Sequence, residues 1–244
     1  MFGSAKSVDR RVISLLDPMS FEAEQYRRIQ HQIEELRGGS GVRTLALTSA
    51  VAGDGKTLTS VNLALTLARG AGAKVVLIDM DLRRPTVGKV LGLPVSRGGV
   101  SALLLQPKAT LQDFLQPVPR SNLKVALTSV TRADPYELLT STRFVELLEQ
   151  ARSEFDYVVL DTPPVIPVPD TTLIHRHVDG YLVVVSAHTT PRKLVGEALS
   201  LLPPSSVLGI VFNRDDRPMF GYYRGHYRQY FRNYVRAMGE RESA

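Results

Sequence analysis

The sequence contains no cysteine and no run of apolar residues that is long enough to cross a bilayer. Without cysteine the chain has no disulfide, no thiolate metal site and no thiol nucleophile, which fits a reducing compartment. A transmembrane helix needs about 20 apolar residues, and the first 11 residues here are polar and basic with no apolar stretch behind them. We therefore expect neither anchor nor signal peptide, and a cytoplasmic location.

The chain does have enough apolar residues for one sizeable core and a moderate excess of positive charge. It is 244 residues long and 43% hydrophobic, so we expect one domain. Thirty Lys and Arg against 24 Asp and Glu give a net charge of +6 and a pI near 9.6. This charge suits a nucleotide, acidic lipid or nucleic acid, but many ordinary soluble proteins carry a similar excess.

Short apolar runs alternate with helical patterns from residue 42 onward. The predicted strands cover residues 44–48, 74–78, 123–127, 157–160, 181–185 and 207–212. Continuous apolar strands separated by helices indicate a mostly parallel sheet with helices on both faces, which is a doubly wound α/β fold of the P-loop NTPase type. Residues 93–120 have scattered Gly and Pro, and we expect short helices and loops there.

Two segments flank this predicted core. Residues 21–37 have the pattern of a helix, and the Gly-Gly-Ser-Gly sequence at 38–41 predicts a flexible stop. After Asn213 the chain becomes rich in tyrosine and arginine, with few aliphatic residues. We therefore divide the chain into an N-terminal segment (1–41), an ATPase or kinase core (42–216) and a C-terminal tail (217–244).

The predicted strand 44–48 leads into Ser-Ala-Val-Ala-Gly-Asp-Gly-Lys-Thr at residues 49–57, and a helical pattern follows at 58–69. Two glycines let backbone N–H groups curl around phosphates at a helix N-terminus. Lys56 would reach the β- and γ-phosphates of ATP, and the Thr57 hydroxyl would ligate Mg²⁺. The alternative is a glycine-rich turn, but the strand-loop-helix context favours a phosphate loop. We predict nucleotide contacts at Ala52, Gly53, Asp54, Gly55, Lys56, Thr57 and Leu58.

Two further apolar strands end in carboxylates. Asp79 and Asp81 close the strand 74–78, and Asp161 closes the strand 157–160. Alternate residues of an extended segment point the same way, so Asp79 and Asp81 are both expected to face the crevice at the sheet's carboxyl edge. One could hold Mg²⁺ and the other accept a hydroxyl proton, with Asp161 as a further metal ligand. Helix capping is the alternative for the first pair.

The last predicted strand closes with Asn213 and Arg214. The asparagine amide has the donor and acceptor needed for an adenine edge. An asparagine at the end of a strand is equally well explained as a turn former. Both interpretations stay open from the sequence.

With these motifs in place, residues 21–214 resemble the bacterial tyrosine kinases of capsule and exopolysaccharide regulation. That family's motifs read Ser-Ala-x-Pro-Gly-Glu-Gly-Lys-Ser/Thr, Ile-Asp-x-Asp-x-Arg-x-Pro and Ile-Asp-Thr-Pro-Pro. The matching segments here are residues 49–57, 78–85 and 160–164, supported by residues 135–139, 178–180 and 190–192. Ala52 replaces the loop proline, which is expected to loosen the loop without abolishing phosphate binding.

The resemblance implies a Mg²⁺-dependent, autophosphorylating tyrosine kinase. Lys56 and Thr57 would serve phosphates and metal, Asp81 and Asp161 the metal, and Asp79 would be the base. It further implies activation by the cytoplasmic end of a membrane polysaccharide co-polymerase, recruitment to the inner face of the plasma membrane, and a tyrosine phosphatase. The family forms oligomers through Glu-x-x-Arg-x-x-Arg, and here Gln30 replaces the second arginine, so a homo-oligomer through this helix stays open.

The tail carries the tyrosines that the resemblance identifies as phosphoacceptors: Tyr222, Tyr223, Tyr227, Tyr230 and Tyr234. At helical spacing four of them share one stripe, beside a face of arginines. Such a stripe more often packs than serves as a substrate, but the family context favours autophosphorylation.

Two rival functions stay open. A partitioning or cell-division positioning ATPase shares the fold, but those proteins usually have lysine where this chain has Val51. Alternatively the core is idle and the basic tail binds acidic lipid or nucleic acid. Steep salt dependence of binding would mark the second rival, and we expect nucleic acid not to be a partner.

Overall fold

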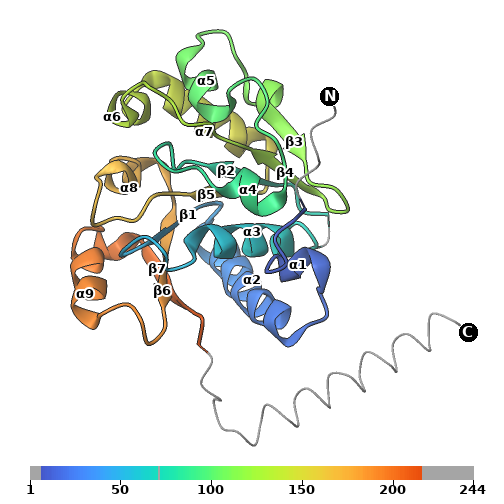
Figure 1. The fold of residues 1–244 in the computed structure, drawn as a ribbon, viewed down its shortest axis with the longest axis vertical. Coiled ribbons are helices and arrows are strands. Elements are labelled where there is room, and N and C mark those ends of the chain that lie inside the picture. The colour runs from blue at the N-terminus through green and yellow to red at the C-terminus, as the bar shows by residue number, and fades with distance from the viewer. Residues whose placement is uncertain (1–6, 71, 216–244) are drawn as a thin grey trace, which may run out of the picture.

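The computed structural model describes residues 7–70 and 72–215, and these form a seven-stranded sheet between two layers of helices (Figure 1). The strand order is β3-β4-β2-β5-β1-β6-β7. The strands are β1 (Thr44–Ser49), β2 (Val75–Asp79), β3 (Leu115–Pro117), β4 (Leu123–Ala126), β5 (Tyr157–Asp161), β6 (Gly180–Ser186) and β7 (Val207–Asn213). All neighbours are parallel except β3 and β4. The predicted doubly wound α/β fold is confirmed.

The sheet's register aligns the ends of its central strands. Asp79 of β2 is paired with Asp161 of β5, and Leu47 of β1 is paired with the same Asp161. In a parallel sheet these ends meet at one edge, where ligands bind in doubly wound folds. The three motifs found in the sequence are thereby brought together.

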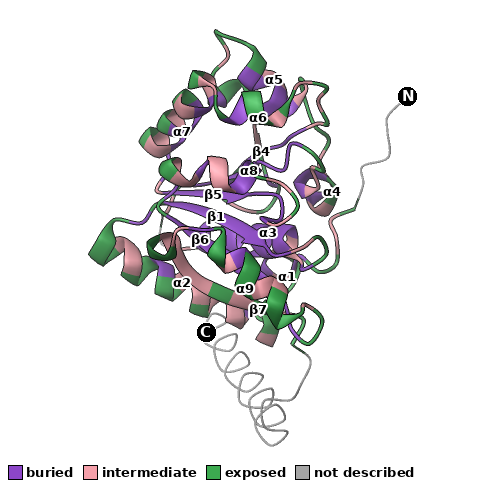
Figure 2. Cartoon of the chain, turned by 90° about the vertical axis from the view of Figure 1, so that its left-hand side faces the viewer, coloured by how far each residue is buried: buried purple, intermediate pink, exposed green. Residues whose placement is uncertain are grey.

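Nine α-helices and three single-turn 3-10 helices surround the sheet in the described residues. They are α1 (Ile13–Leu16), α2 (Phe21–Ser40), α3 (Lys56–Leu67), α4 (Val87–Leu91), α5 (Gly99–Leu105), η1 (Leu111–Phe114), α6 (Pro135–Leu139), α7 (Thr142–Glu154), α8 (Asp170–Leu173), η2 (His175–His177), α9 (Arg192–Ser200) and η3 (Pro204–Ser206). Helix α3 contacts β1, β2 and β5, and α2 packs over it from outside. Figure 2 shows α3 and the central strands buried and the outer helices partly exposed.

The alternation of side chains along each strand divides the core into two clusters. Leu45 and Leu47 of β1 pack on the side of α2 and α3, whereas Ala46 between them packs on the opposite side. All six residues of β1 are buried because the sheet is covered on both faces. Val12 and Ile33 from the N-terminal segment are fully buried in the first cluster, so this segment packs directly against the core.

The end of α2, the strand β3 and the ends of the other strands differ from the sequence-based prediction. Helix α2 does not stop at residue 37 but continues through Gly38 and Gly39 to Ser40, and the N–H of Gly41 then bonds the Arg37 carbonyl. Gly38 and Gly39 are exposed, so this last turn carries the helix-propensity cost of two glycines, about 1 kcal/mol each, and the left-handed Gly41 ends it. Strand β3 lies within residues 93–120, where the sequence predicts only short helices and loops, because three residues are too few to show the alternation of apolar and polar side chains typical of a strand. The other strand ends shift by one residue.

No helix within residues 7–70 and 72–215 is both long enough and apolar enough to span a membrane. The tail tyrosines lie outside the described residues.

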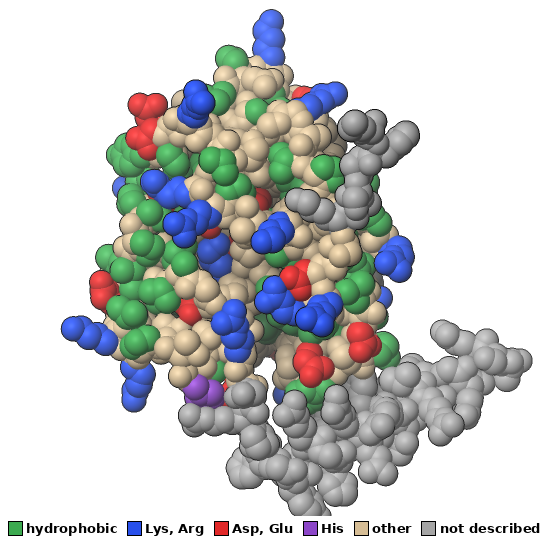
Figure 3. All heavy atoms as spheres, viewed as in Figure 1, with side chains coloured by type: hydrophobic (Ala, Val, Ile, Leu, Met, Phe, Trp, Pro, Cys, Tyr) green, Lys and Arg blue, Asp and Glu red, His purple; other side chains and the backbone are tan. Residues whose placement is uncertain are grey.

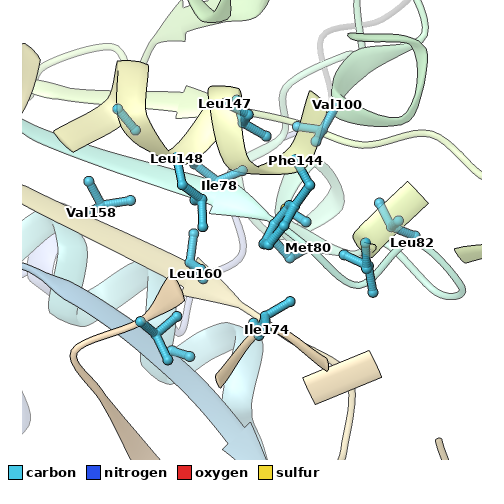
Figure 4. Close-up of a cluster of buried hydrophobic side chains, with 14 of the residues drawn as sticks. Ile78, Met80, Leu82, Val100, Phe144, Leu147, Leu148, Val158, Leu160 and Ile174 are labelled. Atoms are coloured by element: carbon cyan, nitrogen blue, oxygen red, sulfur yellow. The ribbon is translucent and has the colours of Figure 1, made fainter. Parts of the chain in front are cut away.

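The second core cluster generates a stability prediction. Phe144 of α7 is fully buried and points toward Met80 at the end of β2, among Ile78, Leu148 and Leu160 (Figure 4). Its ring also meets the ring of His177 edge-on at 5.6 Å. Phe144→Ala should lower the free energy of unfolding by about 3 to 5 kcal/mol, because the cavity lies between sheet and helix.

Denaturant unfolding measures this effect. The matched control is Tyr136→Ala, since Tyr136 lies on α6 with 51% of its surface exposed. That substitution should cost less than about 1 kcal/mol. Equal losses in the two variants would show that the cluster is not the main core of this layer.

Candidate nucleotide and metal site

The loop between β1 and α3 has the backbone geometry of an anion-binding turn. Gly53 and Gly55 have φ angles of 98° and 93°, which side-chain-bearing residues rarely adopt. A Cβ at Gly55 would lie 2.0 Å from the Nδ2 atom of Asn213, so glycine is required there twice over. Gly55 is the N-cap of α3 and no side chain caps that helix. Its first N–H groups therefore remain available for phosphate.

Lys56 is the first residue of α3, and it forms ion pairs with two of the aspartates at the carboxyl edge of the sheet. Its Nζ lies 2.9 Å from Asp81 Oδ2 and 3.8 Å from Asp161 Oδ2. Only 11% of the Lys56 side chain is exposed. Burial by itself lowers the pKa of Lys56, but the carboxylates of Asp161 and Asp81 outweigh it and raise the pKa above its usual value. The lysine is therefore charged.

Asp161 is fully buried and accepts hydrogen bonds from two hydroxyls of α3. Thr57 Oγ1 donates to Asp161 Oδ2 at 2.6 Å, and Ser60 Oγ donates to Asp161 Oδ1 at 2.9 Å. Thr86 Oγ1 lies 3.0 Å from Thr57 Oγ1 and extends this network toward α4. Burial raises the pKa of Asp161 even though Lys56 and the two hydroxyls lower it.

Asp79 belongs to the same cluster but differs in its partners. Its carboxylate oxygens accept backbone N–H groups, from Val87 at 3.1 Å and Asp81 at 3.3 Å, and the residue has no exposed surface. Burial, and then the nearby Asp161, raise the pKa of Asp79 well above its usual value. Asp81 instead uses its side chain for Lys56 and for the N–H of Arg84. The sequence therefore predicted that both aspartates lie at the site, but not that Asp81 contacts Lys56 while Asp79 contacts only backbone N–H groups.

The donor set fits a magnesium ion. Three buried carboxylates lie near one ammonium, and burial, together with the repulsion between neighbouring carboxylates, raises the pKa values of Asp79 and Asp161. No group of three His, Asp or Glu side chains in residues 7–70 and 72–215 is arranged as a complete metal cage. Mg²⁺ usually takes one or two carboxylates together with hydroxyl, water and substrate phosphates. Thr57, Asp81 and Asp161 could supply that partial set.

Asp54 and Asn213 fix the tip of the loop. Asp54 is buried, and its Oδ1 accepts the Thr190 hydroxyl at 2.5 Å. Asn213 donates from Nδ2 to the Asp54 carbonyl at 2.8 Å and accepts the N–H of Arg214 at 2.9 Å. Asn213 thus contacts the phosphate loop directly, a role that neither the turn nor the adenine interpretation included. Ala52 and Gly53 are exposed on the loop, and Leu58 is half-buried.

Several residues of the site escaped sequence reasoning. Arg83 donates from Nε and Nη2 to both oxygens of the buried Asp170, at 2.8 and 2.9 Å, and so ties the segment after β2 to α8. Ser60 and Thr190 also join the network. Arg83, Ser60 and Thr190 all lie in segments that the sequence analysis named, but no pattern in the sequence pairs residues so far apart.

The strand-loop-helix geometry and the aspartates at the ends of β2 and β5 define this protein as a P-loop ATPase. Residues 42–190 match the family model described as an AAA domain. Over 221 residues the chain is 34% identical to the tyrosine-protein kinase YwqD of Bacillus subtilis (strain 168), an alignment that covers 88% of this chain and 92% of that protein. The chain belongs to the bacterial tyrosine-protein kinases, which confirms the resemblance drawn from its motifs.

Two further comparisons agree. The kinase domain of the Escherichia coli tyrosine kinase ETK superposes with a TM-score of 0.79 at 25% identity, over 89% of this chain and 85% of that one. The succinoglycan biosynthesis transport protein ExoP of Rhizobium meliloti (strain 1021) is 32% identical over 238 residues, which cover 91% of this chain and 30% of ExoP.

The raised pKa of Asp79 predicts a specific pH dependence. A carboxyl whose folded pKa exceeds its ordinary value of 3.8 holds its proton more tightly in the folded state. Its contribution to stability is complete at low pH and is lost as pH rises through the folded pKa. Asp79→Asn removes that loss, so the variant's free energy of unfolding relative to wild type should increase as pH rises from about 4 upward.

Unfolding titrations across this range measure the difference. Asp156→Asn is a control of opposite sign, because the Lys74 N–H and Arg37 lower the pKa of Asp156. For that variant the loss of stability relative to wild type should develop as pH rises toward the ordinary value of 3.8 and stay nearly constant above about pH 5, so the titrations are extended to acid pH. A difference for Asp79→Asn that stays flat with pH would contradict the assignment of a raised pKa.

Proposed function

We propose that this protein transfers the γ-phosphoryl group of ATP to tyrosine hydroxyls, including those of its own C-terminal tail, and thereby regulates polysaccharide synthesis and export. The observation that carries the proposal is the buried cluster of Lys56, Thr57, Asp81 and Asp161 at the N-terminus of α3, in a chain of the tyrosine-kinase family. The cluster would bind the phosphates of ATP, and membership of the tyrosine-kinase family indicates that the phosphoryl acceptor is a tyrosine.

The loop would bind the triphosphate through its backbone N–H groups, from Ala52 through Gly55 to the start of α3 at Lys56, Thr57 and Leu58. Uncapped N–H groups and the helix dipole favour anions there. Lys56 would place its ammonium against the β- and γ-phosphates. Asn213 and Arg214 remain our candidates for the adenine end, and Asn213 would have to exchange its bond to the Asp54 carbonyl for one to the base.

Thr57, Asp81 and Asp161 would hold Mg²⁺, whose chemistry is to neutralise the charge on the β- and γ-phosphate oxygens. Asp79 is the proposed base. The tyrosine oxygen attacks the γ-phosphorus, its proton passes to the carboxylate, and the bond from the γ-phosphorus to the β–γ bridging oxygen breaks to release ADP. Each carboxylate oxygen of Asp79 accepts one N–H group and keeps a further acceptor site, but the residue has no exposed surface, so the incoming hydroxyl would need a path to it.

The phosphoacceptors in this proposal are Tyr222, Tyr223, Tyr227, Tyr230 and Tyr234. They follow β7 closely in the chain, and β7 ends at Asn213, in contact with the phosphate loop. In the sequence, few residues therefore separate Asn213 from the first of these tyrosines. Each phosphate would add a charge of about −1.5 to −2 beside an arginine.

We further propose a membrane partner. ExoP is named as a transport protein, and this chain corresponds to 30% of it. We propose that a separate polysaccharide co-polymerase takes the place of the part of ExoP that this chain does not match. The cytoplasmic end of that protein would activate the kinase and recruit it from the cytoplasm to the membrane. Basic side chains gather near the middle of the face in Figure 3, and exposed Arg83, Arg84 and Lys89 adjoin the site. They suit an anionic ligand or surface.

A tyrosine phosphatase and self-assembly complete the proposal. In α2, Arg27 forms an ion pair with Glu24 and also donates to the Pro18 carbonyl. Gln30, at the position of the family's second arginine, donates to Glu34 within the same helix. A homo-oligomer would therefore depend on Glu24 and Arg27 without a second arginine contact.

The direct test incubates purified protein with Mg²⁺ and ATP and locates phosphate by mass spectrometry, with and without the cytoplasmic fragment of a candidate partner. Phosphotyrosine in residues 217–244 supports the proposal. Binding of DNA or anionic vesicles without phosphotransfer, lost steeply with salt, would favour the idle binding module instead.

Lys56→Met should abolish ATP hydrolysis and phosphotransfer, because the phosphates lose their point-charge partner and the carboxylates their ammonium. Phosphate release and phosphotyrosine formation are the measurements. Lys108→Met is the control, since Lys108 is exposed in the loop after α5 and should behave as wild type. Undiminished turnover in Lys56→Met would remove the phosphate-loop proposal.

Replacing the five tail tyrosines with phenylalanine should remove most autophosphorylation and leave ATP hydrolysis and the melting temperature nearly unchanged. Phenylalanine keeps the ring and therefore preserves any packing. Phosphate stoichiometry by mass spectrometry and oligomer size by light scattering are compared before and after Mg-ATP. If both proteins incorporate the same amount of phosphate, the tail is a packing or binding surface and not the substrate.

A further inference from the structure

The loop between β6 and α9, residues 187–191, contacts the phosphate loop through a single buried carboxylate. Asp54 is 2% exposed, and its two oxygens have different partners. Oδ1 accepts the Thr190 hydroxyl at 2.5 Å, and Oδ2 accepts the N–H of Val51 at 3.4 Å. Asp54 thus joins the beginning of the phosphate loop to a segment more than 130 residues away.

Thr190 is itself held in place. Its N–H donates to the carbonyl of Ser186 at the end of β6, at 3.0 Å, and Pro191 follows as the N-cap of α9. The residue is half-buried, between a strand end and a helix start. A hydroxyl fixed in this way can serve as a rigid support for a partner.

Asp54 is held from a second side as well. Its carbonyl accepts Nδ2 of Asn213 at 2.8 Å, and the Asn213 carbonyl in turn accepts the N–H of Ala187 at 2.8 Å. The peptide between Asp54 and Gly55 is thereby fixed in orientation. It directly precedes the uncapped N–H groups at the start of α3, which are available to phosphate.

The buried carboxylate of Asp54 lies in the loop that is proposed to bind the triphosphate, a place where negative charge is unfavourable. Negative charge there opposes an anionic ligand, and a buried carboxylate without hydrogen bonds is costly. Thr190 and Val51 supply those bonds, whereas the carboxylates paired with Lys56 are Asp81 and Asp161. The charge of Asp54 is therefore used to fasten the loop and not to bind the lysine.

We propose that Thr190 is a positioning residue for the nucleotide: through the Asp54 carboxylate it holds the phosphate loop in the shape that receives the triphosphate. This inference rests on the proposed nucleotide site. It assigns to the loop between β6 and α9 a part in ATP affinity that does not require contact with ATP.

The test compares Thr190→Val, which keeps the shape and removes the hydroxyl, with Thr190→Ser, which keeps the hydroxyl. Calorimetric titration with Mg-ATP measures Kd, and initial rates at saturating ATP measure kcat. Thr190→Val should raise Kd roughly tenfold, the scale of one lost hydrogen bond to a charged group, while kcat changes little. Thr190→Ser should stay within about twofold of wild type.

Thr189→Val is the matched control. The Thr189 hydroxyl has one weak local bond, to the Ala187 carbonyl at 3.4 Å, and its loss should leave Kd unchanged. A double-mutant cycle with Asp54→Ala adds a sharper readout, because two residues that act through one contact are not additive. The double variant should therefore bind Mg-ATP no more weakly than Asp54→Ala alone.

Three results would overturn the inference: wild-type Kd in Thr190→Val, equal weakening by Val and Ser, or full additivity with Asp54→Ala. Melting temperatures of all variants are measured alongside, and titrations are made well below them, so that unfolding does not enter Kd. If wild type itself binds no Mg-ATP, the proposed function fails, and that outcome is distinct from the three above.

Discussion

The balance of charge between one lysine and three buried aspartates is the constraint on which the rest of this structure depends. Lys56 lies 2.9 Å from Asp81, and Asp161 lies within ion-pair distance of the same ammonium. Asp79 remains behind them with backbone N–H partners only. Gathering carboxylates in a buried place is costly, and burial accordingly raises the pKa values of Asp79 and Asp161. The Lys56 ammonium and the hydroxyls of Thr57 and Ser60 offset part of that cost at Asp161.

The sheet order satisfies this constraint geometrically. Strand β5 lies between β1 and β2, so Asp161 falls between the phosphate loop and the acidic segment after β2. Helix α3 then brings Thr57 and Ser60 onto Asp161 from one side of the sheet. On the opposite side, Phe144 and its neighbours hold α7 against β2 and β5. Packing on both faces of the sheet thus holds the side chains at its carboxyl edge within hydrogen-bond distance of one another.

A second set of contacts closes the site around the tip of the loop. Asp54, Thr190 and Asn213 connect the phosphate loop with the ends of β6 and β7, and Arg83 with Asp170 connects the segment after β2 with α8. Each of these contacts therefore joins two segments that lie far apart in the sequence. In the sequence, the tyrosine-rich tail follows β7 after a few residues.

Much of this protein was determined by its sequence alone. Apolar runs of strand length separated by helical patterns predicted the doubly wound sheet, and the spacing of glycines, lysine and aspartates predicted the residues at its carboxyl edge. These signals are local, because each motif needs its residue types within a few positions. Only the tertiary structure decided that Asp79 is buried while Asp81 contacts Lys56, that Asn213 bonds the Asp54 carbonyl, and that Thr190 supports Asp54. Those outcomes depend on strand order and on which backbone groups need partners, and neither is encoded in a pattern of neighbouring residues.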